Sequence, residues 1–135
     1  MERMIAEEHW GYYAFVLANN EVAEKGKIVC IDTGNAGIII MGKTATGLIP
    51  IGIAMESFTG NGVKKLQVKL FREIQATYWD NDGTTPCAAT DRGTLCYIKN
   101  NTTVSKDSTG RSTAGIILDV DATMGVLVHW GLKAF

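Results

Sequence analysis

One pattern of turn glycines and β-branched residues occurs twice along this chain, and no other feature limits the fold as strongly. Gly52 and Gly62 are ten residues apart, and so are Gly115 and Gly125. The pattern occupies residues 26–31, 51–54 and 62–63, and again residues 93–98, 114–117 and 125–126. Short apolar runs bounded by turn glycines are typical of strands. The repeat therefore predicts two similar β units, at about residues 24–71 and 91–131.

The size and composition predict one mainly β domain with a substantial core. The chain has 135 residues, of which 46% are hydrophobic, and it contains 15 glycines but only two prolines. Many glycines suit tight turns between many strands. We therefore expect a small β-barrel or sandwich built from the two units, with at most one or two short helices. An N-terminal segment or arm at residues 1–18 is expected to precede a single domain at residues 19–135.

The charge pattern argues against nucleic acid and membranes as partners. Thirteen basic and 14 acidic residues leave a net charge of −1, without the dense basic stripe that nucleic acid requires. Residues 47–55, the longest mostly apolar stretch near the centre, are too few to span a bilayer. No signal peptide is recognisable at the N-terminus, so synthesis in a cytoplasm is expected. Three cysteines, an odd number, agree with reduced thiols.

Two of the three cysteines, Cys30 and Cys96, are expected to pack in the core. Cys30 and Cys96 are interpreted as occupying matching places in the repeat, which favours small buried residues. A bridge between Cys87 and Cys96 is conceivable across a loop, but nothing in the sequence indicates an oxidising compartment.

Residues 37–44 match the phosphate-binding loop letter for letter, but their chemistry favours a strand. The interior of the match is Ile-Ile-Ile-Met, and Gly47 and Pro50 follow where a helix would have to begin. We therefore predict a hydrophobic strand flanked by turn glycines. A nucleotide-binding enzyme remains a rival hypothesis, which tight binding lost on Lys43→Ala would support.

No catalytic, cofactor-binding or metal-binding residue is predicted. The spacing of Asp80, Asp82 and Asp91 resembles a calcium loop only faintly, because the required glycine is misplaced, so an ordinary turn is favoured. His9 and His129, the only two histidines, lack cysteines at zinc-finger spacing.

The densest aromatic cluster lies near the N-terminus, at Trp10, Tyr12, Tyr13 and Phe15. Aromatic side chains in such a cluster either pack in the core or anchor an interface with a partner. These four residues are the candidates for contact with another subunit.

The repeat resembles the small capsid decoration, or cement, proteins of tailed bacteriophages. The residues that carry the resemblance are 25–29, 51–54 and 62–63, repeated as 92–95, 114–117 and 125–128, within a matching region of about residues 20–130. The resemblance implies a non-enzymatic virion protein that binds the major capsid protein, commonly as a homotrimer at threefold sites of the expanded head. It also implies that the N-terminal segment, with its aromatic residues, orders against the capsid. The protein would then be located on the capsid surface.

A second hypothesis is a fibre or receptor-binding module that recognises a glycan or a protein through its loops. Exposed aromatic side chains in loops 77–91 or 99–113 would favour it, and only Tyr78 and Trp79 qualify there.

Overall fold

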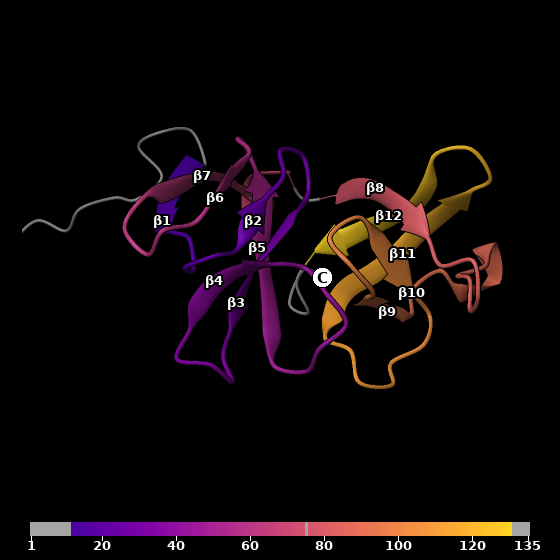
Figure 1. Ribbon diagram of the computed structural model, residues 1–135. Coiled ribbons are helices and arrows are strands. Elements are labelled where there is room, and N and C mark those ends of the chain that lie inside the picture. The colour runs from indigo at the N-terminus through magenta and orange to yellow at the C-terminus, as the bar shows by residue number, and fades with distance from the viewer. Residues whose placement is uncertain (1–11, 75, 131–135) are drawn as a thin grey trace, which may run out of the picture.

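The computed structural model describes residues 12–74 and 76–130, and its strands form two five-stranded units that follow one another along the chain (Figure 1). The first unit is a sheet with the strand order β1-β7-β5-β3-β4. Its strands are β1 (Tyr12–Val16), β3 (Ile28–Asp32), β4 (Ile38–Met41), β5 (Leu48–Ala54) and β7 (Lys65–Leu70). A separate two-stranded ribbon is formed by β2 (Val22–Ala23) and β6 (Phe58–Thr59).

The second unit is a closed barrel with the order β10-β8-β12-β11-β9. Its strands are β8 (Ala76–Asn81), β9 (Leu95–Ile98), β10 (Thr103–Ser105), β11 (Thr113–Asp121) and β12 (Gly125–Trp130). A short helix, α1 (Phe71–Ile74), connects the units, and a 3-10 turn spans Ala89–Asp91. Both helical segments that the structure describes are too short to cross a membrane. The predicted mainly β fold with a barrel is confirmed.

The two units share one topology, strand for strand. The first unit runs β1-β7-β5-β3-β4 and the second runs β8-β12-β11-β9-β10, so each strand has an equivalent in the same place. The registers also agree, because Val29 lies opposite Gly52 as Cys96 lies opposite Gly115. The structural units begin at β1 and β8, whereas the sequence pattern begins only near residues 24 and 91. Residues 12–18, placed in an N-terminal segment by the sequence, therefore belong to the first unit.

A glycine beside a β-bulge marks the same corner in both units. The register shifts next to Gly52 on β5 and next to Gly115 on β11. A Cβ atom added at Gly52 would meet the carbonyl oxygen of Lys69, and one at Gly115 would meet that of His129. Bulges and glycines let a sheet bend sharply, so this pair of features coils each sheet toward closure.

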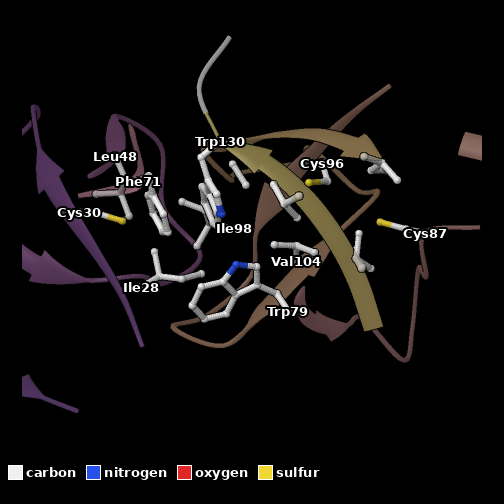
Figure 2. Packing of buried hydrophobic residues seen from close by; sticks show 14 of the residues in the cluster. Ile28, Cys30, Leu48, Phe71, Trp79, Cys87, Cys96, Ile98, Val104 and Trp130 are labelled. Atoms are coloured by element: carbon white, nitrogen blue, oxygen red, sulfur yellow. The ribbon is translucent and has the colours of Figure 1, made fainter. Parts of the chain in front are cut away.

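The first unit packs the outer face of β3 and β4 against the second unit, so both units contribute to one core. Val29 and Ile39 point into the first unit, while their neighbours Ile28 and Ile40 join the cluster of the second unit. Phe71 stacks on Trp130 with ring centroids 3.9 Å apart, and Trp79 meets both rings edge-on (Figure 2). The contact between the units is therefore apolar and well packed.

All three cysteines are buried free thiols, as expected for Cys30 and Cys96, but these two are not equivalent. The registers match Cys96 with Val29, one residue before Cys30. Because neighbouring residues of a strand face opposite ways, Cys96 lies inside its own barrel and Cys30 faces the other unit. Burial raises the pKa of both the Cys30 and the Cys96 thiol to about 12.

Thr77 is expected to stabilise the junction between the units through its hydroxyl group. Its Oγ1 accepts the indole N–H of Trp79 at 2.6 Å and that of Trp130 at 2.7 Å. Thr77→Val leaves both N–H groups buried without an acceptor and should lower the free energy of unfolding by about 2 kcal/mol. Thr77→Ser keeps the hydroxyl and should retain most of the free energy of unfolding. Chemical denaturation measures both, and equal losses would contradict the assigned role.

Candidate functional surface

The aromatic residues singled out by the sequence lie on β1, with one exception. Tyr12, Tyr13 and Phe15 belong to this strand, which pairs antiparallel with β7, whereas Trp10 lies outside the described residues. Phe15 packs against the core of the first unit, and the Tyr13 ring lies beside it with centroids 4.8 Å apart. Tyr13 remains 42% exposed. The core and interface interpretations therefore apply to different residues of one strand.

The other edge of β1 is largely unpaired. Leu17 donates its N–H to Lys64 at 3.3 Å, on the β7 side. Backbone N–H and C=O groups alternate in direction along an antiparallel ladder. Those of Ala14 and Val16 therefore point away from β7, toward the other edge of β1. On that side the described residues contribute only a parallel bridge between Leu17 and Ile39 and the hydrogen bond from Ala18 N to Ile39 O, 3.0 Å.

In the second unit the corresponding junction, or seam, between β8 and β10, the first and last strands in the order of that sheet, is fully paired. There β8 and β10 pair at two positions, and Asp80 donates to Thr102 at 2.9 Å while Asp82 donates to Val104 at 3.0 Å. In the first unit the equivalent of Asp80 is Val16. Within the described residues, the pairing of β1 with β4 does not reach Val16. The first unit is therefore a barrel of the same design with its seam open over most of β1.

A shallow groove runs along this open seam. Residues 16–19, residues 36–39 and Gly62 line it. Val16 is 42% exposed beside the groove, and the Lys69 ammonium lies 4.7 Å from the centre of the Tyr12 ring. An unpaired strand edge next to apolar side chains is the arrangement that accepts an added strand from another chain. We call β1 and this groove the open seam.

The segment that matches a phosphate-binding loop is a strand, as predicted. Residues Ile38–Met41 form β4, and Ile39, Ile40 and Met41 are buried. Lys43 is bridged to Asn100, and the Thr44 hydroxyl donates to the Lys99 carbonyl at 2.7 Å. The element that follows β4 is the strand β5 and not a helix, so no helix N-terminus faces an anion there.

The acidic residues considered for a calcium site are separated by the fold. Asp82 is 1% exposed and pairs with Lys99, whereas Asp91 pairs with Lys106. Within residues 12–74 and 76–130, no three His, Cys, Asp or Glu side chains gather as metal ligands would. His129 lies on β12, and His9 lies outside the described residues.

The buried Asp82 carboxylate was not predicted by the sequence, which assigned it to a turn. It accepts hydrogen bonds from Lys99 Nζ at 2.6 Å, Ser105 Oγ at 2.8 Å and Thr84 N at 3.0 Å. These donors, Lys99 first, hold the pKa of Asp82 far below its usual range. The equivalent positions of the first unit are Ala18, Asp32 and Ile40, so the repeat contains no signal for this cluster. The arrangement satisfies a buried charge and stabilises the barrel.

The aromatic residues that would have favoured a loop-based recognition module lie in a strand. Tyr78 and Trp79 belong to β8, where Trp79 is buried in the core and only Tyr78 is exposed, at 37%. No protein-family model matches this sequence, and no curated protein or solved structure is significantly similar to it.

Proposed function

We propose that this protein is a non-enzymatic structural protein of a phage virion that binds the outer surface of the expanded capsid. Its partner is the major capsid protein, and it acts as a homotrimer at threefold sites. The open seam is the observation that carries the proposal, because an exposed strand edge with apolar neighbours suits attachment to another chain. The resemblance of the repeat to decoration proteins supplies the identity of that partner.

The proposed mechanism is mechanical. An extended segment of a capsid subunit pairs with the free backbone groups of Ala14 and Val16, and the exposed Tyr13 ring contributes apolar contact beside them. The rigid two-unit body then holds that segment in place. Several such contacts on one trimer give an avidity far above that of a single contact, and in this way the trimer stabilises the expanded head.

Binding to heads tests the proposal. Purified protein mixed with expanded, undecorated heads should bind saturably, with three copies at each threefold position. Proline at the exposed Ala14 removes one backbone donor from the open seam but none from the β7 ladder. Ala14→Pro should therefore weaken head binding about tenfold. Val63, which is 75% exposed in the loop before β7, provides the control Val63→Pro, which removes a local hydrogen bond to Asn61 but no donor of the open seam.

Two results would contradict the proposal. The first is an absence of binding at micromolar concentrations of wild-type protein. The second is equal head binding by Ala14→Pro and Val63→Pro when thermal unfolding shows both variants to be folded, because the open seam would then play no part.

A further inference from the structure

The contact between the two units joins a side of the first unit to an end of the second. The side surface consists of Ile28, Ile40, Leu48 and the loop 42–45, and the end surface consists of Ile98, the loop 99–102 and Ser112. Ile28 N donates to Asn101 O at 2.9 Å. Ser112 Oγ accepts from Leu48 N at 2.8 Å and donates to Ala45 O at 2.6 Å.

Because the units share topology and register, each has both a side surface and an end surface, and the chain uses only one of each. The unused side surface lies on the second unit, where Leu95 is the equivalent of Ile28. The unused end surface lies on the first unit, where Ile31 is the equivalent of Ile98 and Ile49 that of Ser112.

Each unused surface carries one exposed apolar side chain at a position that is buried in the contact between the units, whereas the equivalent of Ile40 is the buried Ser105. Leu95 is 38% exposed, although its equivalent Ile28 is 0% exposed. Ile49 is 51% exposed, although its equivalent Ser112 is 7% exposed. The place of these two side chains favours a covered interface, because each stands where the equivalent residue of the other unit is buried.

The backbone at Leu95 gives a second reason to expect an interface there. The pairing of β3 with β4 ends at Val29 and Met41, so the backbone N–H of Ile28 is left for the other unit. It donates to the carbonyl oxygen of Asn101, in the loop 99–102. Pairing of β9 with β10 stops at Tyr97, so Leu95 likewise has no strand partner on that side within the described chain. A loop equivalent to 99–102 would meet this free edge, and residues 32–37 form that loop in the first unit.

We propose that the end surface of the first unit docks on the side surface of the second unit of another copy of this chain. The contact repeats between copies the arrangement that joins the units within one copy, with Leu95 in place of Ile28 and Ile49 in place of Ser112, so that apolar contact replaces the hydrogen bonds of the Ser112 hydroxyl. Two different surfaces meet, which makes the interface heterologous, and such an interface builds a closed ring or a filament. The inference goes beyond the capsid proposal because it requires no capsid.

Sedimentation of the purified protein without heads tests the inference. The wild type should self-associate as its concentration is raised to about 100 µM. A contact of modest affinity forms in this concentration range. Ile49→Asp and Leu95→Asp each place a charge in the interface and should weaken self-association about 30-fold. Val63→Asp, at a position 75% exposed and outside both surfaces, should leave it unchanged. All three sites are exposed, so the fold is expected to persist, and circular dichroism checks it.

Mixing the two variants distinguishes a heterologous contact from a symmetric one. Ile49→Asp retains the side surface and Leu95→Asp retains the end surface, so an equimolar mixture should form a one-to-one dimer that grows no further. A monomeric wild type, variants that associate as strongly as Val63→Asp, or a mixture that stays monomeric would each overturn the inference. Head binding is measured separately, so failure here is distinguishable from failure of the capsid proposal.

Discussion

Alanine at Gly115 is expected to lower the free energy of unfolding by about 3 kcal/mol, although it adds only one methyl group. The added Cβ would overlap the carbonyl oxygen of His129 and approach the backbone of Trp130, on the neighbouring strand β12. Backbone atoms of a paired strand cannot rotate away as a flexible side chain does. Relief therefore requires β11 and β12 to separate where the barrel bends, which weakens their hydrogen bonds.

The chain contains matched comparisons for this effect. Gly52→Ala meets Lys69 in the equivalent corner of the first unit and should cost a similar amount. Gly83 has no atom within 4 Å of an added Cβ, and Gly83→Ala should change stability by less than about 0.5 kcal/mol. Thermal unfolding should show a midpoint lowered by about 10 °C for Gly115→Ala. A shift no larger than that of Gly83→Ala would show that the corner tolerates a side chain.

Removal of the Asp82 carboxylate is the second large effect that we expect. Asp82→Ala should lower the free energy of unfolding by about 3 kcal/mol, because it leaves Lys99 and Ser105 without their shared acceptor. The Lys99 side chain is 33% exposed and regains some contact with water, which keeps the loss at the lower end for a buried pair. The pair between Arg92 and Asp119 is exposed at 60% and 42%. Asp119→Ala should therefore cost no more than about 0.5 kcal/mol.

The same carboxylate predicts a dependence of stability on pH. The pKa of Asp82 is lowered in the folded protein, so its contribution is complete above the unfolded pKa of about 4 and is lost as the pH falls toward the folded value. Stability measured by denaturation from pH 6 down to pH 2 should fall more steeply for the wild type than for Asp82→Asn. Parallel curves would show that the ion pair contributes nothing to folding.

The strand pattern and its repeat were predictable because they depend on neighbours in the sequence. Residues 51–54 and 114–117 place a glycine at the same point of a β-branched run, and both became the bulged corner of a sheet. The first strands of the two units were not recognised as equivalent. Tyr12–Val16 and Ala76–Asn81 have no identical residue at equivalent positions, and only their pairing with β7 and β12 relates them.

The sequence by itself determined that this chain forms two similar β units with glycines at their sharpest bends, because alternation, β-branching and the lack of a side chain act within a few residues. Only the tertiary structure decided which edges and side chains remain exposed. Strand order, seam closure and the pairing of Asp82 with Lys99 join residues that are distant in the sequence. Such contacts depend on the packing of the whole chain, so local patterns do not encode the open seam or the free surfaces around Ile49 and Leu95.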